Sequence, residues 1–223
     1  MKGLAVIGTD TGVGKTVVAS MLMAVAAPSV HYWKPVQTGA EGESEPDDDT
    51  GRVCELAHLD PQRVAQPTYR FALPASPHHA AMVEGRSICL DDITVQAQKL
   101  SRTEGNRWVV EGVGGVMVPL SNDVLWTDLH RALNLPAILV SSTRLGTINH
   151  TLLTLAQCRQ EGVDILGVVL VGAPDPSARS GIMAHGDVPL LGEIPWMEGL
   201  DVGHLRHHGC ALMDAPRIAE SLV

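Results

Sequence analysis

The nine residues GTDTGVGKT, at positions 8–16, decide the fold of this chain. They follow a short apolar run at residues 4–8 and open a stretch with helical character at residues 14–26. In such a strand–loop–helix turn, backbone N–H groups and the start of the helix cradle phosphate oxygens, and glycines let the backbone approach closely. The stretch therefore predicts a phosphate-binding loop (P-loop).

Two side chains at the end of this loop carry the chemistry of phosphate binding. Lys15 can reach the β- and γ-phosphates of a nucleotide, and the Thr16 hydroxyl suits Mg²⁺. A chance glycine-rich turn is the alternative, but the strand before the loop and the helix after it favour a functional site. We therefore expect the nucleotide to bind at Gly12, Val13, Gly14, Lys15 and Thr16.

The details of the loop separate it from two other classes of nucleotide-binding protein. Five residues lie between Gly8 and Gly14, one more than in the common pattern. Asp10 stands where partition-type and cell-division ATPases carry an extra lysine. The Asn-Lys-x-Asp sequence with which Ras-like GTPases read guanine does not occur in the chain.

The composition is that of an ordinary globular protein and argues against some partners. The 223 residues, 45% hydrophobic and 18% charged, suffice for one domain over residues 1–223. A formal net charge of −9 argues against nucleic acid, whose phosphates demand a basic surface. No segment approaches the roughly 20 apolar residues of a membrane span. The four scattered cysteines are typical of reduced thiols in a cytoplasmic protein.

Short apolar runs alternate with helical stretches, which is the pattern of a parallel sheet covered by helices. We therefore predict an α/β fold, a single P-loop domain whose mainly parallel sheet is flanked by helices on both faces. Residues 40–49, which are acidic and glycine-rich, predict a mobile loop, and the proline-rich residues 66–77 predict another. The predicted strands cover residues 4–8, 30–33, 107–111, 137–141, 165–171 and 190–194, and the predicted helices cover residues 14–26, 50–59, 90–103, 127–135, 148–161 and a stretch near 211–222.

A second lysine follows the second predicted strand, in the sequence KPVQTG at residues 34–39. Pro35 ends the strand and restricts Lys34 to an extended backbone. Since functional loops lie at the carboxyl ends of parallel strands, Lys34 would bring a second cation toward the phosphates. A lone lysine after a strand is usually just solvated, so this assignment depends on the neighbouring motifs.

Carboxylates occur at two places where a metal could bind. Three aspartates at residues 47–49 begin a predicted helix, where aspartate is also a common N-cap. Glu111 ends an apolar strand and precedes the glycine-rich residues 112–115. Mg²⁺ favours oxygen ligands, and glycines can bring backbone N–H groups to a substrate. The sequence thus predicts a magnesium site formed by Thr16, one of the three aspartates and Glu111.

Taken together, these segments resemble the dethiobiotin synthetase family of P-loop enzymes. The family pattern runs GTDTxVGKT, KPVx[ST]G, an acidic loop ending in Asp, EGAGG, a proline–leucine pair, [KR]LGxINH and a late LGEIPW-like strand. This order holds over about residues 3–198, and the combination is specific because related P-loop ATPases share only the first motif. The corresponding segments are residues 8–16, 34–39, 49, 111–115, 119–120, 144–150 and 191–196.

The resemblance implies an ATP-dependent ligase that joins CO₂ to 7,8-diaminononanoate. One amine takes up CO₂ as a carbamate, and the carbamate oxygen attacks the γ-phosphate to form a carbamic–phosphoric anhydride. The second amine then closes the urea ring and expels phosphate. Cations would compensate the anionic charge that develops during the transfer. The implied catalytic residues are Lys15, Lys34 and Thr11, and the implied Mg²⁺ ligands are Thr16, Asp49 and Glu111.

The resemblance also implies a homodimer, in which residues 145–149 of one subunit cover the substrate carboxylate of the other. A helix N-terminus at this segment suits an anion. Thr11 and Thr38 would hydrogen-bond the carbamate or the amine. The implied substrate-binding residues are Thr38, Glu111, Gly112, Val113, Gly114, Leu145, Gly146, Thr147 and Asn149.

Two departures from the family pattern affect the expected specificity. Val113 replaces the alanine of EGAGG, so the substrate wall is expected to be tighter. Gly172 stands where an asparagine often reads adenine, and Pro195 can pack on any base without selecting one. We therefore expect ATP to be used but poorly distinguished from other nucleoside triphosphates, unless neighbouring backbone groups read adenine.

Two other functions remain open at this point. One is another amide-forming P-loop ligase, such as a cobyrinate diamide synthase, but these normally carry a glutaminase domain for which the chain has no room. The other is a non-catalytic nucleotide switch that binds a partner protein. Asp10 and the EGVGG segment at residues 111–115 argue against the switch.

Overall fold

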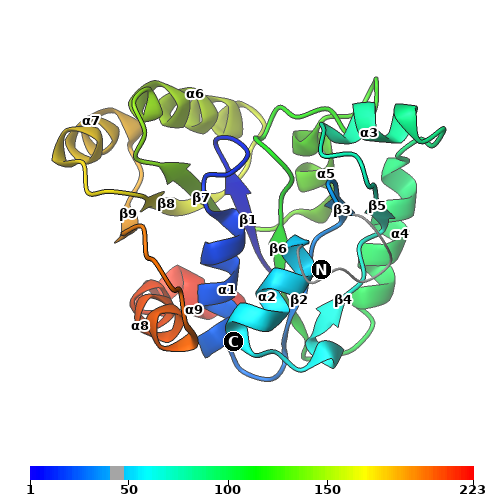
Figure 1. The fold of residues 1–223 in the computed structure, drawn as a ribbon, viewed down its shortest axis with the longest axis horizontal. Coiled ribbons are helices and arrows are strands. Elements are labelled where there is room, and N and C mark those ends of the chain that lie inside the picture. Colours follow the sequence, from blue (N-terminus) through cyan, green and yellow to red (C-terminus); the bar gives the residue numbers. More distant parts are fainter. Residues whose placement is uncertain (41–47) are drawn as a thin grey trace.

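A seven-stranded sheet forms the centre of the protein in a computed structural model that describes residues 1–40 and 48–223 (Figure 1). Its strand order is β4-β2-β6-β1-β7-β8-β9, and all of its strand pairings are parallel. A separate parallel pair joins β3 (Val36–Gln37) to β5 (Tyr69–Arg70). The strands of the sheet are β1 (Gly3–Gly8), β2 (Val30–Trp33), β4 (Val64–Ala65), β6 (Arg107–Glu111), β7 (Ala137–Ser142), β8 (Ile165–Val171) and β9 (Leu190–Ile194).

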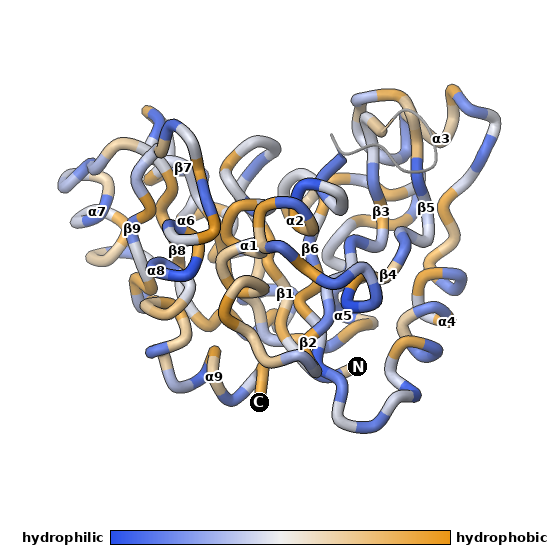
Figure 2. The backbone as a smooth tube through the Cα atoms, turned by 60° about the horizontal axis from the view of Figure 1, so that its bottom comes forward, coloured by the Kyte–Doolittle hydropathy of each residue, from blue (hydrophilic) through white to orange (hydrophobic). Residues whose placement is uncertain are grey.

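Helices cover both faces of the sheet, as the sequence predicts (Figure 1). Two apolar clusters, one on each face, bury the sheet between them, because the sheet must cover both of its apolar faces. Hydrophobic and hydrophilic residues alternate along α4 in Figure 2, as expected for a helix with one buried side. One face carries α1 (Lys15–Val25), α2 (Asp49–Ala57), α8 (Val202–Met213) and α9 (Pro216–Leu222), and the other carries α3 (Pro77–Val83), α4 (Leu90–Leu100), α5 (Trp126–Leu133), α6 (Thr147–Gln160) and α7 (Pro176–Gly186).

The predicted strands are all present, but two predictions, the helix near residues 211–222 and the loop at residues 66–77, need correction. Instead of one helix near residues 211–222 there are two, α8 and α9, because Pro216 cannot continue the first helix. The predicted loop at residues 66–77 contains β5, and the sequence did not predict α3 or α7. The predicted mobile loop at residues 40–49 lies largely outside the described residues. Among the described residues, each helix is too short or too polar to cross a bilayer.

The register of three neighbouring strands brings distant segments to one edge of the sheet. Val6 of β1 lies beside Glu111 of β6, and Trp33 of β2 lies beside Val110. Adjacent strands are about 4.8 Å apart. The loop after β1, the last residue of β6 and the residue after β2 therefore meet at the carboxyl edge of the sheet, where α/β proteins of this kind bind ligands.

Candidate functional site

Backbone geometry at the loop after β1 depends on glycine. Gly14 has φ of 103° and forms the N-cap of α1, and a Cβ atom there would lie 3.0 Å from Val171 of β8. Only glycine adopts such a φ readily. The loop therefore approaches β8 closely and turns directly into α1.

Lys15 joins this loop to the glycine-rich segment after β6. Its Nζ atom donates to the backbone oxygens of Asp10, at 2.7 Å, and of Gly114, at 2.9 Å. The side chain is buried, and burial, reinforced by the charge of Lys34, lowers the pKa of Lys15 to about 8. An anionic ligand beside Lys15 would act in the opposite direction and raise the pKa of Lys15 again.

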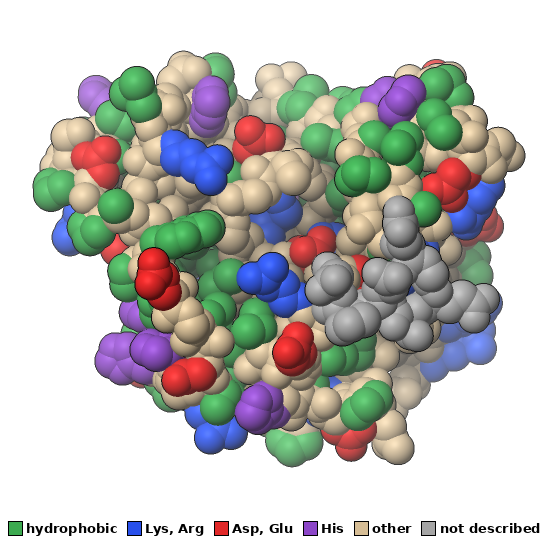
Figure 3. Space-filling model, in the orientation of Figure 1, with side chains coloured by type: hydrophobic (Ala, Val, Ile, Leu, Met, Phe, Trp, Pro, Cys, Tyr) green, Lys and Arg blue, Asp and Glu red, His purple; other side chains and the backbone are tan. Residues whose placement is uncertain are grey.

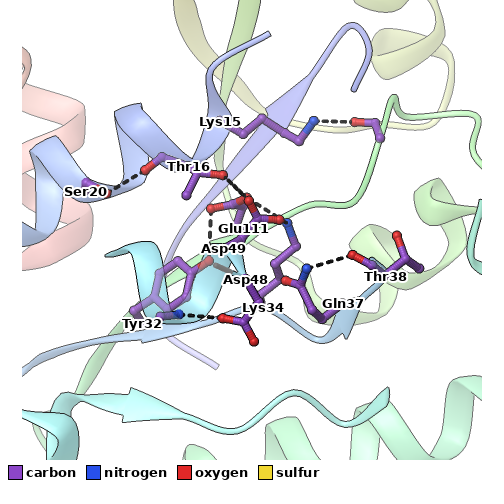
Figure 4. Close-up of polar contacts among 12 residues, drawn as sticks. Lys15, Thr16, Ser20, Tyr32, Lys34, Gln37, Thr38, Asp48, Asp49 and Glu111 are labelled. Carbon is purple, nitrogen blue, oxygen red and sulfur yellow. Dashed lines mark hydrogen bonds and ion pairs between the residues drawn. The ribbon is translucent and has the colours of Figure 1, made fainter. Parts of the chain in front are cut away.

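Lys34 lies between two carboxylates (Figure 4). Its Nζ donates to Glu111 Oε1 at 2.8 Å and also forms an ion pair with Asp49. The Thr16 hydroxyl is 2.9 Å from an oxygen of each of the same two carboxylates. Residues far apart in the sequence thus form one polar network at the ends of β2 and β6 and the starts of α1 and α2.

Charge within this network sets the protonation of its members. Burial alone would lower the pKa of Lys34, but Glu111 and Asp49 outweigh it and hold that pKa above its ordinary value. Burial acts on Asp49 in the opposite direction, and Lys34 with the Thr16 hydroxyl keeps the pKa of Asp49 below its ordinary value. Near neutral pH, Lys34 is therefore a cation and Asp49 an anion.

Glu111 is held at its other oxygen as well. The Tyr32 hydroxyl donates to Glu111 Oε2 at 2.9 Å (Figure 4). Burial, followed by the charge of Glu111, raises the pKa of Tyr32 well above its ordinary value, so the phenol keeps its proton.

The acidic run at residues 47–49 divides its roles, although Asp47 itself lies outside the described residues. Asp48 is the N-cap of α2, accepts a hydrogen bond from the Gly51 backbone and pairs with Arg70 at 2.7 Å. Asp49, one residue later, instead points toward Thr16 and Lys34. The N-cap therefore falls to Asp48, whereas Asp49 joins the network beside Thr16 and Lys34.

A cavity of about 650 Å³ opens beside the network. Figure 3 shows the hollow near the middle of this face, with lysine or arginine and acidic side chains inside it. The residues expected from sequence that line it are Thr11, Gly12, Gly14, Lys15, Thr16, Lys34, Thr38, Asp49, Glu111, Val113 and Gly114.

Other expected residues lie outside this lining. Val13 packs in the core under α1, and Gly112 passes against the Trp126 ring, where a Cβ atom would meet the ring at 3.1 Å. The Thr147 side chain is buried and bonds Ser141 Oγ at 2.9 Å. The remaining expected residues outside the lining are the exposed Leu145, Gly146 and Asn149, together with Gly172 and Pro195.

Several lining residues did not emerge from the sequence. Trp196 ends the late strand motif, where only its neighbour Pro195 was assigned, and Arg52 lies three residues after Asp49 on α2. Tyr32, which bonds Glu111 but lies outside the lining, was not assigned either, and it stands two residues before Lys34. The other unassigned lining residues are Val17, Pro74, Ala75, Ser76, Pro77 and Val118.

The segments after β8 and β9, where the sequence places the base, carry backbone contacts and exposed surface rather than buried charges. Gly172 has φ of 138°, and its N–H donates to the Ile194 oxygen at 2.9 Å. A Cβ atom at this position would lie 2.3 Å from Thr143 Oγ1. The place of a side chain at position 172 is thus already taken by Thr143. Trp196 is 70% exposed at the rim of the cavity.

Comparison with known proteins reveals close relatives over most of the chain. Residues 2–202 match the model of a family described as an AAA domain. An ATP-dependent dethiobiotin synthetase BioD from Bradyrhizobium sp. is 42% identical over 204 residues, covering 92% of each chain. One with the same name from Rhodopseudomonas palustris is 40% identical over 198 residues, covering 89% of each chain.

A solved structure shows the same fold at much lower identity. The ParA family ATPase from Chlorobium tepidum covers 100% of this chain and 98% of its own, with a TM-score of 0.57 and 14% sequence identity. At this identity the likeness concerns the fold alone. It agrees with the P-loop fold predicted from sequence, while Asp10 distinguishes this chain from the partition-type pattern.

Proposed function

The chain belongs to the family of ATP-dependent dethiobiotin synthetases, and we propose that its cavity is the site where ATP, CO₂ and 7,8-diaminononanoate are joined. The reaction closes the ureido ring of dethiobiotin in biotin biosynthesis and yields ADP and phosphate. It passes through a carbamate and a carbamic–phosphoric anhydride. The protein is thus an ATP-dependent cyclo-ligase.

One observation carries the assignment of the cavity. Two lysines, two carboxylates and the hydroxyl of the phosphate loop converge at the ends of adjacent strands. Phosphoryl transfer to a carbamate gathers negative charge in one place, so catalysis depends on fixed positive charge where that charge develops. Lys15 and Lys34, which both line the cavity, would supply it.

Lys15 is proposed to bind the β- and γ-phosphates. Its present acceptors are the backbone oxygens of Asp10 and Gly114, which phosphate oxygens can replace as better partners for an ammonium group. The N–H groups of Gly12, Val13 and Gly14 would complete the cradle at the start of α1.

Thr16, Asp49 and Glu111 are proposed to hold Mg²⁺. Their hydroxyl and carboxylate oxygens are the hard ligands that Mg²⁺ prefers, and Lys34 already bridges the two carboxylates, so the place suits a cation. In the described part of the chain, no group of three or more His, Cys, Asp and Glu side chains gathers as a metal site. The proposed set instead combines two carboxylates with the Thr16 hydroxyl, which lies 2.9 Å from an oxygen of each. When bound, Mg²⁺ neutralises phosphate charge and favours attack at the γ-phosphate.

The diamine is proposed to lie between the glycine-rich segment after β6 and the proline-rich segment before α3. Val113, Val118 and residues 74–77 form an apolar wall suited to its alkyl chain, while Thr11 and Thr38 offer hydroxyls to the carbamate or amine. Lys34, which lines the cavity together with Thr38, is proposed to stabilise the carbamate as it attacks. Gly114, which lines the cavity, would bring backbone close to this substrate.

A homodimer completes the proposal. Leu145, Gly146, Thr147 and Asn149 lie at the start of α6, where Leu145 is fully exposed. This helix start would cover the substrate carboxylate of a second subunit. Mixing a Lys15→Ala subunit with a subunit altered at Asn149 would restore activity in the mixed dimer, whereas a monomer with full turnover would rule the dimer out.

The proposal also gives the protein a cytoplasmic location, which its four free cysteines support. ATP is the proposed co-substrate, and other nucleoside triphosphates are proposed to replace it with modest loss.

The deciding experiment measures phosphate release with ATP and Mg²⁺, in the presence and absence of 7,8-diaminononanoate and bicarbonate. We expect release to require both substrates and to equal the dethiobiotin formed, measured by mass spectrometry. Phosphate release that ignores the diamine, or that needs a second protein, would instead support a nucleotide switch.

A further inference from the structure

Tyr32 is a buried side chain with one polar contact that the reaction as described does not use. It lies in β2, has no exposed surface and packs in the apolar cluster under α1. Its hydroxyl is nevertheless 2.9 Å from Glu111 Oε2, the oxygen that faces away from Lys34 and Thr16 (Figure 4).

Glu111 is therefore held at both oxygens. Oε1 accepts from Thr16 at 2.9 Å and from Lys34 at 2.8 Å, and Oε2 accepts from Tyr32. These donors come from α1, from the end of β2 and from its interior, so they approach the carboxylate from different directions. Tyr32 lies within β2 and Lys34 directly after it, and both reach the Glu111 carboxylate.

We propose that Tyr32 is a positioning residue that occupies Glu111 Oε2 and so presents Oε1 alone to Mg²⁺. This inference rests on the proposed metal site. Mg²⁺ demands near-ideal octahedral geometry and tolerates misplaced ligands poorly. A carboxylate fixed at one oxygen binds through the other without first being ordered.

The burial of Glu111 makes this hydrogen bond necessary. The carboxylate has almost no exposed surface, so water cannot satisfy an oxygen that loses its partner. Without the Tyr32 hydroxyl, Glu111 would turn to recover a partner for Oε2, and Oε1 would leave the position set by Thr16 and Lys34. The remainder of the ring packs as phenylalanine would.

The chain offers a matched control. Tyr69 is the second of its two tyrosines. Its hydroxyl donates to Asp92 at 2.5 Å and accepts from the Cys89 backbone at 3.0 Å, away from the cavity lining. Tyr69→Phe therefore removes the same atom, and two hydrogen bonds rather than one, without touching Glu111.

The test measures metal affinity apart from turnover, by titrating Mn²⁺ into the protein with ADP and following free Mn²⁺ by electron paramagnetic resonance. We expect Tyr32→Phe to weaken Mn²⁺ binding by about 10- to 100-fold. The Mg²⁺ concentration for half-maximal activity should rise by the same factor, while kcat at saturating Mg²⁺ stays within about threefold. Tyr69→Phe should change neither quantity.

A Glu111→Gln background tests the route of the effect. If Tyr32 acts through Glu111, adding Tyr32→Phe there causes little further loss of Mn²⁺ affinity. Full additivity of the two losses, or wild-type Mn²⁺ affinity in Tyr32→Phe, would overturn the proposal.

A measurement on the unaltered protein covers the case in which Tyr32→Phe does not fold. With ¹³C-labelled tyrosine, only Tyr32 and Tyr69 contribute ring signals. Mg²⁺ with ADP should shift the Tyr32 signals and leave those of Tyr69 in place, and an unshifted Tyr32 signal would refute the link. Since neither binding readout needs the diamine, failure of the proposed reaction would show separately, as absent dethiobiotin.

Discussion

The two ends of the proposed nucleotide site, the phosphate end and the base end, are built on opposite principles. At the phosphate end, Lys15, Lys34 and Glu111 are buried and joined by hydrogen bonds and ion pairs to four elements of the fold. At the base end, the backbone N–H of Gly172 donates to the Ile194 backbone oxygen, and the Trp196 side chain is mostly exposed. On the proposed site, we therefore expect the triphosphate to be recognised through charge and the base through little more than surface contact.

This contrast teaches where specificity and catalysis can reside. Buried charges in a low dielectric act strongly and are already oriented before a ligand arrives. Exposed aromatic surface and backbone groups accept several bases, because none of their polar groups is left unpaired by the wrong one. Changes at the phosphate end should therefore alter turnover far more than changes at the base end.

The largest expected effect comes from the two lysines of the phosphate end. Lys15→Ala and Lys34→Ala should each reduce kcat by at least about a thousandfold, because each removes positive charge from the site of phosphoryl transfer. Dethiobiotin formation measures the loss. Lys99→Ala, on α4 outside the cavity lining, is the control and should behave as wild type. Near wild-type turnover in Lys34→Ala would falsify its role.

Folding must be checked separately for Lys34. Removing it leaves Glu111 and Asp49 close together without their shared cation, so the unfolding free energy should fall. Lys34→Met keeps the aliphatic stem and offers a second variant. Circular dichroism and thermal unfolding would show whether lost turnover occurs in folded protein.

A smaller effect is expected at the proposed metal ligands. Asp49→Asn and Glu111→Gln should each raise the Mg²⁺ concentration for half-maximal activity by about 10- to 100-fold, with less change in diamine binding. Asp48→Asn is the matched control, since it alters the neighbouring aspartate, keeps an N-cap side chain and leaves Thr16 alone. Unchanged metal affinity in both ligand variants would show that Mg²⁺ binds elsewhere.

The same contrast explains how much could be read from sequence. The phosphate end was predictable because its residues sit in local motifs at strand ends, and parallel strands gather those ends at one edge. The strands were predictable for a similar reason: runs such as Gly3–Gly8 are buried throughout and read as continuous apolar segments. Sheet order, by contrast, depends on pairings between distant segments and was not predicted.

The elements and site residues that were not predicted are those that no pattern in the neighbouring sequence marks. The two-residue strands β3 and β5 are too short to show any alternation, and Pro216 separates two helices that the sequence merged into one. Arg52 reaches the cavity only because α2 folds against α1. In the sequence, Tyr32 is only one residue of the predicted strand at residues 30–33, and its contact with Glu111 on the adjoining strand emerges only from the structure.

The smallest effect concerns the base end, where kcat/KM for ATP should exceed that for CTP, GTP or UTP by less than about a hundredfold. A hundredfold or larger preference would mean that backbone groups near Gly172 and Pro195 read adenine after all. Trp196→Ala should lower kcat/KM for all four nucleotides by a similar factor, since stacking of a base on the indole ring does not depend on the polar edge of the base. A loss confined to ATP would contradict this.

Restoring the missing amide should not restore selection of adenine. In Gly172→Asn, the new Cβ atom would lie 2.3 Å from Thr143 Oγ1, on a backbone whose φ of 138° suits glycine. We expect a loss of stability of about 1–3 kcal/mol and an unchanged ATP preference. Adding Thr143→Gly relieves the collision but not the backbone strain, so it should recover part of the stability. Thermal unfolding measures the change in stability, and kcat/KM for the four nucleotides measures the ATP preference. A gain in ATP preference above tenfold in Gly172→Asn alone would show that Thr143 yields, and that the base end is less fixed than its contacts imply.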